Sequence, residues 1–294
     1  MKLLGTYING NYRVTIFDDG TKVIENDLDF FRADAPESMD IKITNQCDMG
    51  CPMCHENSTK DGLHGDILNP KFLSTLHPYT ELAIGGGNPL AHPDLVTFLK
   101  WCKEHKLIPS MTINQTHFMK DYDVVKSLVE EKLIYGLGVS LTNPSDEFIE
   151  RIKEFPNAVI HVIAGLVSIS DLEKLSNKGL KILILGYKQF RRGADLYSRI
   201  GSDIEERIQT LKVELAEVLN MFKVVSFDNL AIKQLDPSRL FTKEEYDEFF
   251  MGEDGFATMY IDLVKKEFAR SSTSTDRYPL MDNITDMFEV IRTK

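Results

Sequence analysis

Strand-like apolar runs alternate with helical patterns along most of this chain, and that alternation constrains the fold more than any other feature. A repeated strand–helix order is typical of a parallel sheet with right-handed crossovers. Near-continuous Val, Ile and Leu runs indicate strands that are covered on both faces. Six units fit either a partly closed (β/α)6 barrel or an open doubly wound sheet. The six runs cover residues 39–44, 81–84, 110–114, 135–141, 158–164 and 180–185.

The residues before and after this repetition show other patterns. Residues 2–25 carry hairpin signals at Asn9-Gly10 and Asp19-Gly20, so we predict antiparallel strands there. The repetition stops after residue 222, and a hairpin is predicted in residues 256–270. The sequence therefore divides into an N-terminal β-hairpin segment, an α/β core and a C-terminal α+β extension, at residues 1–35, 36–222 and 223–294.

Local signals set the expected boundaries of several elements. An Asn-Pro start predicts a helix over residues 69–77. Residues 224–232 predict one more strand, and Gly179 is expected to end the helix before the sixth strand. Capping boxes are predicted at Ser170 with Glu173 and at Ser202 with Glu205, the second of which opens a long helix.

The composition narrows the class of protein. At 294 residues and 43% hydrophobic content, with a mean hydropathy of -0.20, the chain is long enough to bury a substantial core. It has no apolar run of the ~18 residues that a membrane span needs, and its start is too short in apolar residues for a secretory signal. We expect a cytoplasmic protein. The net charge of -11 disfavours non-specific binding to nucleic acid.

Three of the four cysteines stand together, directly after the first strand of the repetition. Cys47, Cys51 and Cys54 have the spacing C-x3-C-x2-C, and Gly50 and Pro52 suit a loop that bends sharply between them. Thiolates are soft ligands that suit iron–sulfur clusters. Three cysteines leave one iron of a four-iron cubane without a protein ligand, and an open metal position is what chemistry requires.

Other interpretations of these cysteines compete with a cluster. Two of them could form a disulfide, which a cytosolic chain would keep reduced. They could hold zinc, but zinc usually takes a fourth Cys or His, and His55 directly follows Cys54. Cys102 lies on the apolar face of a predicted helix, so we interpret it as a buried core residue and not as a fourth ligand.

The spacing of Cys47, Cys51 and Cys54 resembles the signature of the radical S-adenosylmethionine (SAM) enzymes. In that family the three cysteines hold a [4Fe–4S] cluster and SAM chelates the fourth iron. Met53 stands where the family often has an aromatic residue. The resemblance covers roughly residues 36–200 and favours the partial barrel over the open sheet.

Polar and glycine residues at the ends of the predicted strands extend the resemblance. The second strand is followed by a segment similar to the family's G-G-E-P motif, which binds the amino group of the SAM methionine, with Asn in place of Glu. The family also places polar residues near the SAM ribose and carboxylate. The residues that the resemblance assigns to SAM are Gly85, Gly86, Gly87, Asn88 and Pro89 in the motif, with Ser140 and Asn114 at the ends of later strands.

Other residues near the strand ends are ambiguous from sequence. His161 alternates with apolar neighbours, as a core histidine would, and it also lies in a stretch that loosely resembles the family's adenine-flanking motif. Arg191 and Arg192 are expected on the surface, with an anionic substrate group as the alternative. The sequence identifies no residue as a catalytic acid, base or radical quencher.

The resemblance implies an enzyme that cleaves SAM reductively to a 5′-deoxyadenosyl radical, which removes hydrogen from a substrate. It also implies an electron donor such as flavodoxin or ferredoxin. A small or nucleotide-like substrate is favoured over a peptide or protein, because the segment after residue 222 has no cysteines for auxiliary clusters. Two alternatives remain: a non-catalytic iron–sulfur protein that carries or senses electrons, and a zinc-stabilised binding module.

Overall fold

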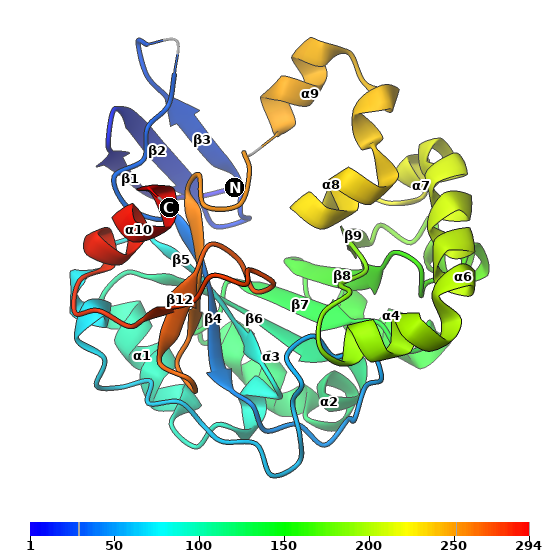
Figure 1. Ribbon diagram of the computed structural model, residues 1–294, viewed down its shortest axis with the longest axis horizontal. Coiled ribbons are helices and arrows are strands. Elements are labelled where there is room, and N and C mark those ends of the chain that lie inside the picture. Colours follow the sequence, from blue (N-terminus) through cyan, green and yellow to red (C-terminus); the bar gives the residue numbers. More distant parts are fainter. Residues whose placement is uncertain (29, 251, 294) are drawn as a thin grey trace.

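The computed structural model describes residues 1–28, 30–250 and 252–293, and Figure 1 shows its arrangement. Its centre is a ten-stranded sheet in the order β10-β9-β8-β7-β6-β5-β4-β11-β12-β13. The first eight strands in this order are parallel, and β12 and β13 continue it antiparallel. The strands are β4 (Ser38–Thr44), β5 (Glu81–Gly86), β6 (Ile108–Asn114), β7 (Gly136–Ser140), β8 (Ala158–Ile163), β9 (Lys181–Leu185), β10 (Val224–Phe227), β11 (Thr258–Asp262), β12 (Glu267–Ala269) and β13 (Tyr278–Pro279).

Helices connect the parallel strands, as the sequence predicts for a βα repetition. Among the described residues the two edge strands of the sheet do not pair with each other, so the α/β sheet is a partial barrel and not a closed one. The helices are α1 (Leu95–Glu104), α2 (Gln115–Lys120), α3 (Tyr122–Glu130), α4 (Asp146–Lys153), α5 (Ile169–Leu175), α6 (Arg192–Val213), α7 (Leu215–Met221), α8 (Asn229–Leu235), α9 (Lys243–Phe249) and α10 (Ile284–Thr293), with short 3-10 turns η1 (Lys71–Thr75), η2 (Pro89–Ala91) and η3 (Pro237–Leu240).

Side chains alternate between the two faces of the sheet. In β6, Met111 and Ile113 are buried in the main core, whereas Ser110, Thr112 and Asn114 lie half-buried on the opposite face. The same alternation holds in β5 and β8. We call the face that carries Ser110 and Thr112 the inner face. Its small and polar residues leave room beside the strand ends where ligands bind in parallel α/β folds.

The N-terminal segment forms a separate three-stranded antiparallel sheet, and not only a hairpin. It consists of β1 (Leu3–Asn9), β2 (Tyr12–Phe17) and β3 (Lys22–Glu25). Lys22 connects it to the main sheet, because its Nζ lies 3.1 Å from Glu37 before β4 and 2.5 Å from Glu81 in β5. Figure 1 shows this sheet at the side where β4 and β5 begin. It is therefore anchored at the end of the strands opposite the cysteine loop.

Four strands from the described part of the chain after residue 222 join the main sheet, although we expected the strand–helix repetition to stop there. β10 adds to β9 in parallel, and the Asp228 side chain caps α8, so the strand predicted over residues 224–232 is half strand and half helix. β11 pairs with β4 in parallel, and Figure 1 shows the orange C-terminal strands beside blue β4. The predicted β11–β12 hairpin is present. The division of the chain into domains stays a prediction.

The boundaries of three predicted helices are wrong. The helix expected over residues 69–77 is the 3-10 turn η1, and its N-cap is Pro70. The capping box of α5 is formed by Ser168 and Asp171, because the same pattern occurs two residues earlier, and α5 ends at Leu175, before Gly179. The long helix α6 begins at Arg192, and the position predicted for its start follows a kink at Ile200 with φ −133° and ψ 29°.

Candidate functional site

The three cysteines lie on the loop that follows β4, at the carboxyl edge of the parallel strands. All three are half-buried. The Cys54 N–H donates to the Cys51 carbonyl at 3.2 Å, and the Cys47 N–H donates to the Thr59 carbonyl at 2.8 Å, which closes the loop on itself. Gly50 has φ +61°, a left-handed conformation that glycine adopts at no steric cost. Short local hydrogen bonds therefore hold the loop that carries the thiols.

The electrostatics of these thiols fit a positively charged ligand. Burial raises the pKa of both the Cys47 and the Cys51 thiol, and the neighbouring thiols raise them further. A bound metal group would offset both effects because thiolates are its ligands. In a tetrahedral zinc site with Zn–S distances of ~2.3 Å, the sulfur atoms lie roughly 4 Å apart. In the described part of the chain the three thiols are not among the sets of ligand atoms that gather within 4.8 Å of one another.

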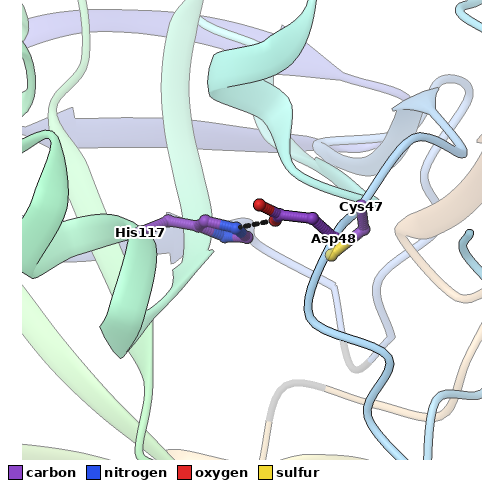
Figure 2. Close-up of side chains that lie close together, drawn as sticks. All are labelled: Cys47, Asp48 and His117. Carbon is purple, nitrogen blue, oxygen red and sulfur yellow. Dashed lines mark hydrogen bonds and ion pairs between the residues drawn. The ribbon is translucent and has the colours of Figure 1, made fainter. Parts of the chain in front are cut away.

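One set of three possible metal ligands does gather that closely: Cys47, Asp48 and His117 (Figure 2). The His117 Nε2 lies 2.7 Å from the Asp48 carboxylate, and this hydrogen bond lowers the pKa of Asp48. His117 is buried in α2, whereas Asp48 is exposed. The contact occupies the ring nitrogen that a metal would need. We therefore interpret it as a bond that fixes the cysteine loop against α2.

Cys102 has the role that the sequence predicts. It lies in α1 among the buried core residues, and burial raises the pKa of its thiol to about 12. A neutral thiol in the apolar core is no metal ligand.

The glycine motif lies directly against the cysteine loop. The Gly87 N–H donates to the Thr44 carbonyl at 2.8 Å, and the Asn88 N–H donates to the Gln46 carbonyl at 2.7 Å. A Cβ on Gly87 would lie 2.2 Å from the Gln46 carbonyl oxygen. Glycine is needed here because the two backbone segments touch.

Gly86 and Gly85 have different surroundings. Gly86 has φ +111°, and a Cβ there would lie 2.4 Å from the Thr44 carbonyl oxygen and 2.8 Å from the Lys42 Cγ. A Cβ on Gly85 would meet no protein atom within 4 Å. Gly86 therefore has a structural requirement for glycine, and Gly85 is the position of the motif that faces open space.

The remaining predicted SAM residues are partly engaged in the protein itself. The buried Asn88 accepts from the Leu90 N–H at 3.2 Å, and Pro89 follows as the first residue of η2. Asn114 accepts from the Thr116 N–H at 2.8 Å and caps α2. Asn114 and Ser140 are register partners, so both stand at the same strand edge. Ser140 is half-buried there.

The two arginines that we expected on the surface hold the chain after the last cysteine. Arg191 Nη1 donates to the His55 carbonyl at 3.2 Å and to the Glu56 carbonyl at 3.0 Å. Arg192 donates to the Ser58 carbonyl. The expectation fails because both side chains cross from the start of α6 to the cysteine loop. Two adjacent arginines were visible in the sequence, but the sequence does not show which way their side chains point.

A buried charged group that the sequence analysis missed lies beside the same loop. The Lys42 Nζ is 2.9 Å from the Glu56 carboxylate and 3.2 Å from the Asp262 carboxylate. Tyr260 donates to Glu56 at 3.0 Å. The only sequence signal was a lysine inside the apolar run of β4.

Polar side chains also line the inner face beneath the strand ends. The His161 ring lies over Gly138, where a Cβ would come within 2.5 Å of its Cε1. Burial, followed by the charge of Lys188, lowers the pKa of His161 to about 4. Asp40 also lies on this face. Desolvation by the surrounding protein raises the pKa of its carboxyl, and the positive charge of Lys188 lowers that pKa in part. Lys188 donates to the Ser272 hydroxyl at 3.1 Å. Lys188 therefore lies close enough to both His161 and Asp40 for its charge to act on them.

Comparison with known proteins places the fold. No family model matches the chain, and no curated protein matches it. Solved structures of SuiB from Streptococcus suis do match, with TM-scores of 0.62 for the peptide-bound and 0.62 for another SuiB structure. The chain has the fold of SuiB.

The SuiB structures differ in what they contain. One is bound to the precursor peptide SuiA, at 14% identity over 87% of this chain and 65% of that chain. A second is bound to S-adenosylmethionine, at 13% identity and a TM-score of 0.57, over 87% of this chain and 64% of that chain. The third is 12% identical over 98% of this chain and 86% of that chain. In the first two matches the chain spans less than two thirds of SuiB. None of its described helices is both long and apolar enough to cross a membrane.

Proposed function

We propose that this chain is a radical SAM enzyme. Cys47, Cys51 and Cys54 would hold a [4Fe–4S] cluster, and SAM would occupy the remaining iron and the glycine motif. When bound, the cluster and SAM supply a 5′-deoxyadenosyl radical that removes a hydrogen atom from the substrate. An electron donor such as flavodoxin or ferredoxin would reduce the cluster.

The observation that carries the proposal is the direct contact between the cysteine loop and the glycine motif. The hydrogen bonds from Gly87 to Thr44 and from Asn88 to Gln46 place the two segments side by side. An electron carrier needs the cysteines alone, whereas an enzyme that binds SAM at the cluster needs a second binding element next to them. The fold of SuiB, one structure of which contains SAM, supports the same assignment.

The chain's own residues would bind and orient the ligand. Gly85 leaves open space next to the motif, so we assign it to the methionine end of SAM. Ser140 and Asn114 stand at the neighbouring strand ends, where they would contact the ribose and carboxylate. Because the Asn88 side chain already caps η2, we assign it no contact with the SAM amino group. The polar inner face beneath them would position the substrate and exclude water.

Two classes of substrate are candidates: a small or nucleotide-like molecule, and a peptide. The absence of cysteines after residue 222 favours a small or nucleotide-like molecule over a substrate that needs auxiliary clusters. The likeness to SuiB, which was solved with its precursor peptide, supports a peptide. Deuterated candidates of both classes can be compared, because transfer of deuterium into 5′-deoxyadenosine identifies the carbon attacked.

The decisive experiment is anaerobic reconstitution followed by reduction in the presence of SAM. The protein is expected to bind about four irons and four sulfides per chain and to form 5′-deoxyadenosine slowly with dithionite. The triple Cys47→Ala, Cys51→Ala, Cys54→Ala variant should do neither, and Cys102→Ala should do both. A reducible cluster that leaves SAM intact would support the electron-carrier alternative. A colourless protein that binds zinc would support the binding module.

A further inference from the structure

The buried charged group beside the cysteine loop joins three segments that are far apart in the sequence. We call Lys42, Glu56, Tyr260 and Asp262 the buried charge network. Lys42 comes from β4, Glu56 from the cysteine loop, and Tyr260 and Asp262 from β11. The side chains of Lys42, Glu56 and Asp262 are 2%, 7% and 0% exposed, so water screens their interaction little.

The network has well-defined geometry. Lys42 Nζ lies between two carboxylates, 2.9 Å from Glu56 Oε2 and 3.2 Å from Asp262 Oδ2. The Tyr260 hydroxyl donates to both oxygens of Glu56, at 3.0 and 3.2 Å. Arg191 contributes a second positive charge, 3.5 Å from Glu56. Two cations thus balance two anions.

Backbone hydrogen bonds from the residues that follow it fix the position of the Asp262 side chain. Its Oδ1 accepts from the Val264 and Lys265 N–H groups at 3.0 and 2.9 Å, in the turn that connects β11 to β12. Asp262 is also the register partner of Lys42 across the parallel β4–β11 pair. The carboxylate therefore presents its second oxygen to Lys42 from a rigid backbone.

The network touches both halves of the candidate cofactor site. Glu56 follows the last cysteine, Cys54, by two residues. The stem of Lys42 lies under the glycine motif, since its Cγ is 2.8 Å from the Cβ position of Gly86. A shift of either charge would move the cysteine loop relative to the motif.

Stability gives no sufficient reason for this arrangement. Burying several charges costs desolvation free energy, and well-packed apolar side chains of the same volume are often as stable or more stable. What charged and hydrogen-bonded partners add is a single defined geometry. Partners that orient the ligands of a site commonly change affinity by ~10- to 100-fold when they are removed.

We propose that β11 contributes to the cofactor site, because its residues Asp262 and Tyr260 are positioning residues. They hold Lys42 and Glu56, and through them they set the cysteine loop at the right distance from the glycine motif. The inference rests on the proposed function and assigns the C-terminal strands a role in it. It makes no residue of β11 a ligand of the cluster or of SAM.

The test compares two Asp→Asn variants. Asp262→Asn removes the buried charge and keeps the volume of the side chain. Asp282→Asn is the matched control, because it breaks an exposed ion pair, Lys71–Asp282 at 2.7 Å, far from the cysteine loop in the sequence. Iron content, SAM affinity by calorimetry and the electron paramagnetic resonance spectrum of the reduced cluster with and without SAM are measured on both.

Asp262→Asn is expected to keep its iron, to bind SAM at least ~10-fold more weakly, and to show a smaller change of the cluster spectrum when SAM is added. Tyr260→Phe should cause the same change with a smaller amplitude. Asp282→Asn should match the wild type in all three measurements. A role in folding alone would lower the melting temperature of Asp262→Asn and leave both the affinity and the spectrum unchanged, and that result would overturn the inference.

A second variant keeps the proposal testable if Asp262→Asn does not fold. Lys42→Met combined with Glu56→Gln and Asp262→Leu removes the three most buried charges together. Arg191, whose side chain is 21% exposed, keeps its hydrogen bonds to the His55 and Glu56 carbonyls. This variant should fold and hold iron yet bind SAM at least ~10-fold more weakly. Wild-type SAM affinity in it would refute the positioning role alone. Wild-type protein that holds no cluster or binds no SAM would instead refute the proposed function, and the inference with it.

Discussion

Two adjacent glycines allow a direct test of how the glycine motif works. Gly86→Ala places a methyl group at φ +111°, where L-residues are strained by about 1–3 kcal/mol. The same methyl would lie 2.4 Å from the Thr44 carbonyl oxygen and 2.8 Å from the Lys42 Cγ, and overpacking of this kind costs about 1–3 kcal/mol. The sum predicts that the free energy of unfolding falls by about 2–6 kcal/mol.

Gly85→Ala is the matched control for stability. Its methyl group meets no protein atom within 4 Å, and its φ is not positive, so the free energy of unfolding should change by no more than about 0.5 kcal/mol. Gly85→Val should also fold, but its side chain would occupy the space that we assign to SAM. We expect SAM to bind it at least tenfold more weakly, which corresponds to ~1.4 kcal/mol.

Thermal and urea unfolding of the cluster-free proteins measure the change in the free energy of unfolding. Calorimetry with SAM on the reconstituted proteins measures the change in SAM affinity. We expect the two effects to separate: Gly86→Ala loses stability, and Gly85→Val loses affinity for SAM. Equal stability of Gly86→Ala and Gly85→Ala would show that the backbone contact with Thr44 is not as tight as the structure has it. Unchanged SAM affinity in folded Gly85→Val would remove Gly85 from the binding site.

Three further predictions concern other residues near the site. His161 is neutral in the folded protein down to pH about 4 but takes up a proton below about 6.5 when unfolded, so the free energy of unfolding should fall by about 1–2 kcal/mol from pH 7 to pH 5. His161→Gln should flatten that dependence in urea unfolding, and an unchanged slope would contradict the assignment. Arg192→Ala should speed amide hydrogen exchange around Ser58, whose carbonyl it holds, and identical exchange would show that the contact is dispensable. Asn88→Ala should cost about 1 kcal/mol by removing the cap on Leu90 and should leave SAM affinity within twofold; a large loss of affinity would return Asn88 to the binding site.

The sequence predicted the parts of this fold that depend on local pattern. Strand–helix alternation identified all six strands from β4 to β9, and helical spacing placed Cys102 in the core. Helix starts were less predictable, since S-x-x-[DE] occurs at both Ser168 and Ser170 and only packing decides between them. The pairing of β11 with β4 could not be predicted, because the two strands are separated by more than two hundred residues and carry no signal for each other.

The same distinction applies to the candidate site. Cys47, Cys51 and Cys54 were recognisable because one loop carries all of them, so their spacing is itself the signal. Lys42, Glu56 and Asp262 become partners only after β11 has joined β4, and each alone looks like an ordinary charged residue.

A protein truncated before β11 would lose the contacts that β11 makes with the candidate site. A chain that ends near residue 222 would retain every cysteine and glycine of the candidate site but would lack β11. Lys42 and Glu56 would then retain each other but lose Asp262 and the Tyr260 hydroxyl, and the edge of β4 would be exposed. Such a chain contains the whole recognisable motif without the contacts that position it. We therefore expect the boundary of the functional unit to follow the partners of the buried charges and not the extent of the sequence motif.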